Sequence, residues 1–257
     1  MYEFAARVER RFRFSKKELF NILLTAIGSS FGITVLKGWG FFDLTGGKGL
    51  FAYLTNFFII SLIMLISLFI HFSVQKLIAL RLGYSSEYKL WLNGLLLGFV
   101  VCFFSNGYLP LFFTGSLLHD VVPKLRVGVF RGGVKHKDLG LIAFGGPFIN
   151  LILVGLLAPL FFVLESPFLK AVIVINLLMA VFSLLPIPTF EKLRQFTGGT
   201  TGLYLFIASR WVFVLVFVTV LAFAALILLF QVFSYLLSLA IGVIVAIIYY
   251  SRFEIGK

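Results

Sequence analysis

Charged residues and cysteine are both scarce in this chain. Asp, Glu, Lys and Arg together make up 12% of the 257 residues, about half of their share in soluble domains. The single cysteine, Cys102, has no second thiol in the chain with which to form a disulfide. These two shortages exclude an ordinary soluble enzyme and a small disulfide-stabilised scaffold.

Apolar residues are abundant instead. They account for 61% of the chain, 33 of them Phe, and the mean hydropathy is +1.09. This composition predicts an integral membrane protein that crosses the lipid bilayer several times. The net charge is +12. In a membrane protein such an excess fixes topology and contacts anionic headgroups. No basic-aromatic recognition motif accompanies it, so we exclude nucleic acid as a partner.

Runs without charge predict six membrane-spanning helices. The run 211–251 has 41 residues, about 61 Å as one helix, so we expect a hairpin that turns near 231–234. The sequence from Ser15 to Glu18 predicts a capping box at the start of the first helix. A basic start before a short apolar stretch also fits a cleaved signal peptide, although a polytopic chain follows. The other expected spans are 19–36, 49–75, 139–164 and 171–190.

The segment 90–118 carries no charge but is interrupted by Ser105 to Pro110, so it either spans the membrane or re-enters. A re-entrant segment places 19 Lys and Arg on the cytoplasmic side and 3 outside, whereas a spanning segment divides them 10 to 12. The positive-inside rule therefore favours re-entry, with both termini cytoplasmic. We expect one integral membrane domain over 1–257, in a prokaryotic plasma membrane. It comprises a basic N-terminus (1–17), a core (18–195) and a C-terminal helical hairpin (196–257).

A short strand is predicted at the membrane surface. From Leu125 to Arg131, apolar Leu125, Val127 and Val129 alternate with other residues, and a Gly-Gly pair follows. Such an edge strand can pair with an extended peptide. The alternative is a basic loop that only fixes topology.

Polar residues inside the spans are functional candidates because lipid disfavours them. His71 and Gln75 lie four residues apart in the second span, on one helical face. Glu191 follows two prolines at the end of the fourth expected span. In the re-entrant topology these features lie on the same side. We expect Asn150 and Asn176 to form hydrogen bonds across helices.

Three of these segments resemble motifs of the site-2 protease family, in the same order. Residues 71–83 resemble its HExxH helix, 139–150 its Gly-Pro-x-x-Asn helix start, and 176–191 its Asn-Leu-Leu-Pro-x-Pro-x-x-Asp-Gly segment. The order and spacing agree over residues 15–195. The resemblance implies an all-α polytopic membrane fold with about six transmembrane helices, a re-entrant segment and a membrane-surface strand region. It also implies a zinc ion held by two His and an Asp, with the motif Glu as general base.

The chain departs from that family at the residues that carry the chemistry. Phe72 stands at the position of the Glu and cannot accept a proton, and Gln75 replaces the second His. Glu191 stands where the Asp belongs, followed by Lys192 instead of Gly. Only His71 is unchanged. A general base contributes about 10²–10⁴-fold to a rate, so the resemblance implies a homologue without catalytic residues, a pseudoprotease.

We therefore expect a site-2-protease-like membrane protein that does not cleave and that binds a transmembrane or extended peptide. His71, Gln75 and Glu191 mark the ancestral metal positions, and Val127, Val129 and Asn150 are the expected peptide contacts. We expect no cofactor, and the alternative is zinc in a weakened site of His71, Gln75 and Glu191. The alternatives are an active zinc metalloprotease with an atypical ligand set, for which His119 and His136 are further ligand candidates, and a small transporter.

Overall fold

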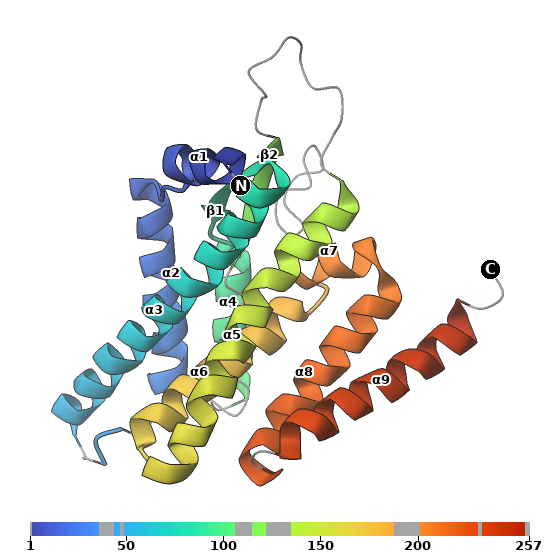
Figure 1. The fold of residues 1–257 in the computed structure, drawn as a ribbon. Coiled ribbons are helices and arrows are strands. Elements are labelled where there is room, and N and C mark those ends of the chain that lie inside the picture. Colours follow the sequence, from blue (N-terminus) through green and yellow to red (C-terminus); the bar gives the residue numbers. More distant parts are fainter. Residues whose placement is uncertain are drawn as a thin grey trace.

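The computed structural model describes residues 2–35, 44–46, 49–105, 115–121, 135–187, 201–230 and 233–254. These residues form a helical bundle with one small sheet, which confirms the predicted all-α membrane fold (Figure 1). Its elements are α1 (Tyr2–Arg11), α2 (Lys16–Val35), α3 (Leu50–Leu82), β1 (Tyr84–Lys89), α4 (Leu92–Phe104), β2 (Ser116–Val121), α5 (His136–Leu164), α6 (Pro167–Leu184), α7 (Thr201–Ala208), α8 (Arg210–Phe230) and α9 (Phe233–Phe253).

Five of the described helices are long and apolar enough to cross a membrane, namely α3, α5, α6, α8 and α9. The remaining expected span, 19–36, corresponds to α2, a 20-residue helix that packs along α3. The capping box that opens it is confirmed, because Glu18 N donates to Ser15 Oγ and Ser15 N donates to a Glu18 carboxylate oxygen. The expected break in the final apolar run is also confirmed, since α8 ends at Phe230 and α9 begins at Phe233.

Two expected helix boundaries are wrong. The second span continues beyond Gln75 to Leu82 and ends at Gly83, whose φ of 95° forms a left-handed cap. The fourth begins at Pro167 rather than Ala171 and ends at Leu184. A short helix that the sequence did not predict, α7, packs against α5.

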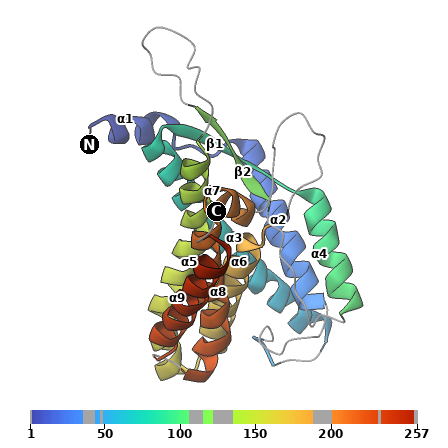
Figure 2. The ribbon, with the colours of Figure 1, turned by 90° about the vertical axis from the view of Figure 1, so that its right-hand side faces the viewer.

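The two described strands form an antiparallel ribbon in which Lys89 pairs with Ser116 and Tyr84 with Val121. The two ends of the segment 90–115 therefore lie side by side at the same end of the ribbon. Its described helix, α4, has 13 residues, about 20 Å, which is shorter than a hydrocarbon core of roughly 30 Å. This is the geometry that a re-entrant segment requires. Figure 2 shows α4 beside α2, and Cys102 Sγ lies 3.1 Å from the Gly32 carbonyl oxygen.

Helix α5 contains two interior prolines, Pro147 and Pro159. A proline lacks the N–H that would bond the carbonyl four residues earlier, so the carbonyls of Ala143 and Gly155 lose their helical partners. Gln75 Nε2 donates to Ala143 O at 3.3 Å, and Tyr235 Oη donates to Gly155 O at 2.8 Å. Both freed carbonyls are thus satisfied by side chains of neighbouring helices, as a lipid environment demands.

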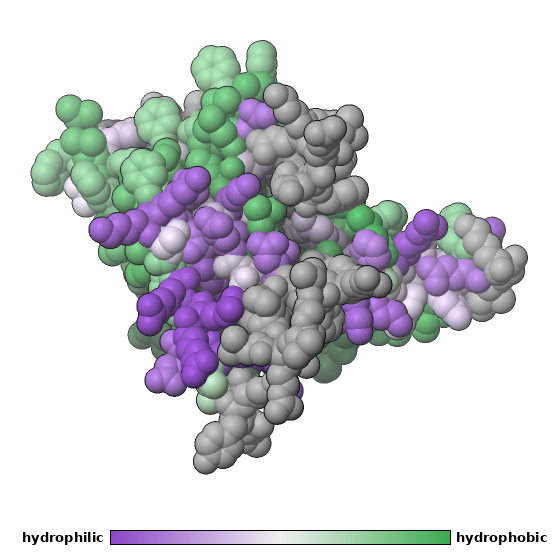
Figure 3. All heavy atoms as spheres, turned by 90° about the horizontal axis from the view of Figure 1, so that it is seen from above, coloured by the Kyte–Doolittle hydropathy of each residue, from purple (hydrophilic) through white to green (hydrophobic). Residues whose placement is uncertain are grey.

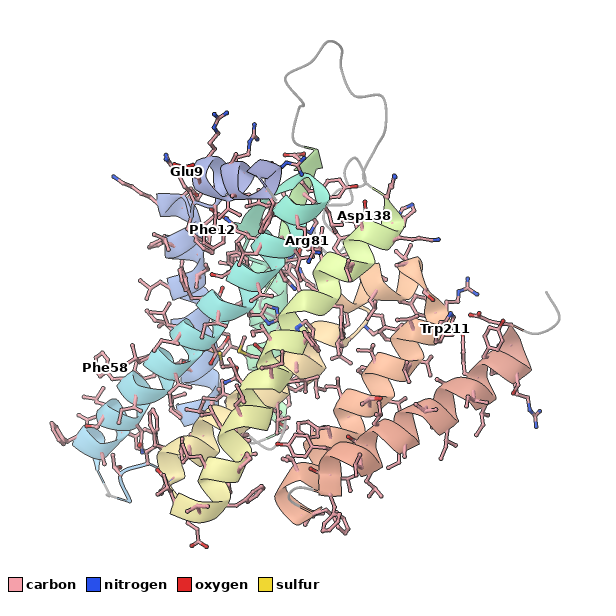
Figure 4. The ribbon with its side chains drawn as sticks, viewed as in Figure 1. Glu9, Phe12, Phe58, Arg81, Asp138 and Trp211 are labelled. Carbon is pink, nitrogen blue, oxygen red and sulfur yellow. The ribbon has the colours of Figure 1, made fainter. Side chains whose placement is uncertain are left out.

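One end of the bundle carries α1 and the sheet, and we call it the basic end. There Arg10, Arg11, Arg13, Lys16 and Lys17 are exposed, and hydrophilic residues gather when it is viewed directly (Figure 3). Arg81 and Asp138 lie toward this end, whereas Phe58 projects outward lower on α3 (Figure 4). The N-terminus lies at the basic end, whereas the end of α9 lies at the side of the bundle, below the level of the sheet (Figure 1).

Candidate functional site

A line of buried polar side chains runs along α3. Ser67, His71 and Gln75 follow one another at intervals of four residues, so they share one helical face. None is more than 4% exposed. Asn176 of α6 donates to Ser67 Oγ at 3.1 Å, and Asn150 of α5 lies 3.1 Å from His71 Nδ1. The expected hydrogen bonds of both asparagines across helices are confirmed, and three helices meet along this line.

Each ring nitrogen of His71 lies near a side-chain amide. The Gln75 amide donates to Ala143 O, which fixes its orientation, and its Nε2 also lies 3.5 Å from His71 Nε2. A neutral imidazole has one donor and one acceptor nitrogen, so the tautomer that accepts from Gln75 at Nε2 donates from Nδ1. An Asn150 amide turned by 180° presents to this N–H its oxygen, which has no other partner among the described residues.

The backbone of α5 lies directly against the imidazole. A Cβ placed on Gly146 would overlap His71 Nε2 and would lie 2.5 Å from Gln75 Nε2. Gly146 therefore permits a close approach that no other residue allows. As a result, the backbone of α5 leaves little room beside His71 Nε2.

The described residues of this site do not by themselves supply the ligand set of a zinc ion. Structural and catalytic zinc sites use three or four nitrogen, sulfur or carboxylate ligands, whereas the described site offers one imidazole and two amides. No group of three His, Cys, Asp or Glu side chains comes together within the described ranges. The third expected metal position, Glu191, lies outside the described residues.

Phe72, at the position of the general base, is fully buried. Its ring lies 4.4 Å from that of Tyr88 in β1, measured between ring centroids, and it belongs to the largest core cluster with Leu68 and Leu117. Tyr88 Oη in turn lies 2.8 Å from Thr25 Oγ1 of α2. Aromatic packing against the sheet thus fills the space beside His71 at the position that the motif resemblance assigns to a carboxylate.

A buried ion pair adjoins this packing toward the basic end. Lys76 Nζ lies 2.5 Å from Glu18 Oε1, and both side chains are at most 4% exposed. Tyr88 N donates to Glu18 Oε1 at 2.7 Å, and Lys76 Nζ donates to Arg13 O. Sequence reasoning identified Glu18 only as part of the capping box and Lys76 only as a topology-fixing charge.

The remaining predicted residues do not join this site. Val127 and Val129 lie outside the described residues, as does the strand predicted from Leu125. His119 lies in β2, where its Nδ1 is 2.7 Å from Ser86 Oγ of β1. His136 is the first residue of α5. Neither histidine contacts His71 in the part of the chain that the structure describes.

The stability of the sheet is expected to fall at acidic pH because of His119. Burial lowers its pKa to about 4, from 6.5, so the unfolded chain binds the proton more readily than the folded chain. Stability therefore decreases as pH falls from about 6.5 through 4. We expect melting temperatures between pH 7 and pH 4 to decline less in His119→Gln than in the wild type. Equal slopes for both proteins would rule out His119 as the cause.

Comparison with known proteins supports a relation to metalloproteases. Over 211 residues the chain is 29% identical to a protein of Methanocaldococcus jannaschii named a "putative zinc metalloprotease", in an alignment that covers 75% of this chain and 92% of that protein. No family model matches the chain. No solved structure matches it either. The chain is therefore a membrane protein with a distant similarity to a protein named for zinc-dependent proteolysis.

Proposed function

We propose that this chain is a site-2-protease-like membrane protein that has lost peptide cleavage and binds a transmembrane or extended peptide segment. The order of the motifs over residues 15–195 and the archaeal relative support the ancestry. The contact of Asn150 with His71, and that of Asn176 with Ser67 one turn away on α3, support it further, because segments that carry the motifs come together on three helices.

The single observation that carries the loss of cleavage is the packing of Phe72 against Tyr88. A phenyl ring accepts no proton, and its burial leaves no space for water at that position. The loss of a general base alone costs about 10²–10⁴-fold in rate. Beside it, the position of the second zinc-binding histidine holds the Gln75 amide, whose nitrogen lies 3.5 Å from His71 Nε2.

The outer edge of β2 supports the binding of an extended peptide. Because Tyr88 N points to Glu18, Tyr88 and its partner Leu117 form a pair without mutual hydrogen bonds. The backbone groups of Leu117 and His119 therefore point away from β1. Among the described residues they have no backbone partner. A peptide strand can bond to such an edge, and Val127 and Val129 remain proposed contacts beyond it.

The basic end faces the cytoplasm of a prokaryotic cell in this proposal. The positive-inside rule assigns to that side the end with α1, whose last turn carries Arg10 and Arg11. The membrane helices then run from this surface to the other side, and the proposed peptide edge lies at the cytoplasmic surface.

Zinc content and cleavage are the decisive tests of lost catalysis. The purified full chain is expected to hold far less than one zinc per molecule, with no difference between the wild type and His71→Ala. It should leave a labelled transmembrane peptide intact with or without a chelator. The name of the archaeal relative favours an active zinc metalloprotease as the second candidate. That candidate requires stoichiometric zinc, lost in His71→Ala, and chelator-sensitive cleavage.

Peptide binding is tested separately by photo-crosslinking. A photoreactive residue at Asp120, which is exposed in β2, is expected to capture an extended apolar peptide. The matched control is Glu87, which is exposed in β1, where the outer edge is closed by Glu18. Equal crosslinking at the two positions would contradict binding at the β2 edge. It would not bear on the loss of cleavage, which the zinc and cleavage measurements decide.

A further inference from the structure

A cleft of about 360 Å³ opens where α8 begins and α9 ends. Its lining residues are Arg210, from the first turn of α8, and Tyr249, Phe253 and Glu254, from the end of α9. It is far along both helices from their hairpin turn and shares no residue with the polar line of α3. Helices α8 and α9 are closest at that turn and spread apart toward the cleft (Figure 1).

The surroundings place this cleft at the boundary between lipid and water. Trp211 and Tyr250 pack edge to face with ring centroids 6.5 Å apart, and Trp and Tyr concentrate at membrane interfaces. Exposed apolar side chains such as Ile247 continue from here along α9 into the span. Hydrophilic residues gather at the open end of the hairpin (Figure 3).

The cleft presents two opposite charges that do not neutralise each other directly. Arg210 and Glu254 both line it, and no ion pair joins them in the described part of the chain. The guanidinium of Arg210 lies 6.0 Å from the ring centroid of Phe206. Tyr249 and Phe253 complete the walls, so the cleft combines a cation, an anion and aromatic faces.

We propose that this cleft binds the headgroup of a phospholipid that carries both a phosphodiester and a primary ammonium group, the phosphatidylethanolamine class. A guanidinium binds phosphate oxygens through paired N–H donors. A carboxylate accepts hydrogen bonds from a primary ammonium, and aromatic faces attract the same cation. A purely anionic headgroup has no ammonium group to pair with Glu254, so its negative charge would be repelled by that carboxylate.

A lipid fits this cleft better than a soluble phosphoethanolamine compound. The exposed apolar surface of α9 below the cleft gives acyl chains a place to lie, and the spread between α8 and α9 widens toward the headgroup (Figure 1). The binding energy of acyl chains comes from apolar area, which a soluble headgroup lacks. The site is independent of the proposed peptide edge and of the loss of catalysis.

Lipid retention by native mass spectrometry tests the proposal on the full chain in detergent. The probes are phosphatidylethanolamine and phosphatidylglycerol with identical acyl chains. The wild type is expected to retain the ethanolamine lipid preferentially. Glu254→Gln should reduce this preference about tenfold, and Arg210→Gln should weaken both lipids about tenfold, as expected for charge-assisted hydrogen bonds. The control Arg252→Gln changes an exposed cation of the same helical turn that does not line the cleft, and its preference should match the wild type.

Three outcomes would overturn the proposal. The first is equal retention of the two lipids by the wild type. The second is an unchanged preference for the ethanolamine lipid in Glu254→Gln, which would show that the carboxylate does not bind the ammonium group. The third is displacement of the lipid by millimolar glycerophosphoethanolamine, which has no acyl chains and would indicate a site for a soluble ligand.

Discussion

Lys76→Met is expected to lower the free energy of unfolding by about 3–5 kcal/mol, because it leaves the Glu18 carboxylate buried without its cation. Lys76 Nζ lies 2.5 Å from Glu18 Oε1 and 4.1 Å from the ring centroid of Phe14. Water does not reach either side chain to compensate for the loss. The pair connects α2, α3 and β1, since Glu18 also accepts from the backbone of Tyr88. Its loss is therefore expected to loosen the sheet as well as the two helices.

Thermal melting in detergent measures this effect. Lys17→Met is the matched control, since Lys17 lies beside Glu18 in the chain but is exposed, and it should melt close to the wild type. The double variant Glu18→Gln/Lys76→Met removes both charges and should melt above Lys76→Met alone. A Lys76→Met protein that melts like the Lys17→Met control would show that the pair is exposed to water.

The same ion pair explains why one helix boundary was predicted wrongly. The sequence rule ended the second span at Gln75, before the charge of Lys76, because a lone cation is expected at the membrane surface. The structure neutralises that charge inside the protein with Glu18, and α3 continues to Leu82. Glu18 lies in another helix, far away in the sequence, so no local pattern could predict the contact.

Other features could be predicted because their signals are local. The capping box at Ser15 follows from residues three apart, and the final hairpin follows from a run too long for one crossing. The bias of Lys and Arg favoured a re-entrant 90–118 segment, and the pairing of Lys89 with Ser116 brings its two ends together as that interpretation requires.

The surroundings of His71 could be predicted only in part. The resemblance of motifs brought out His71, Gln75 and Asn150, which do meet. It did not predict that the Ala143 carbonyl, which lacks a helical partner because of Pro147, would accept from Gln75 and orient it. Nor did it predict Tyr88, because β1 was not expected as a strand. The available signal was the pair of tyrosines at 84 and 88, which lie on one face of a strand, because Tyr favours strands.

Phe72 now behaves as a core residue, and its variants are expected to lose stability rather than gain chemistry. Phe72→Ala should lower the free energy of unfolding by about 3–5 kcal/mol, the usual cost of emptying a buried phenyl site, because the ring is fully buried against Tyr88. Phe72→Leu keeps most of the apolar volume and should lose less. Phe58→Ala is the control, since Phe58 lies on the same helix but is 68% exposed, and in detergent it should melt near the wild type.

Phe72→Glu separates a packed position from a dormant active site. A carboxylate in this position is surrounded by the Tyr88 ring and other apolar groups, and the cation one turn along α3, Lys76, is already paired with Glu18. We expect Phe72→Glu to melt at least as far below the wild type as Phe72→Ala and to cleave no peptide. If Phe72→Glu instead melts like the wild type, the space beside His71 admits water, and aromatic packing has not closed this position.

The double variant Phe72→Glu/Gln75→His restores the HExxH pattern, yet Gly146 still lies against Nε2 of His71. The combined variant is therefore expected to remain without zinc in metal analysis.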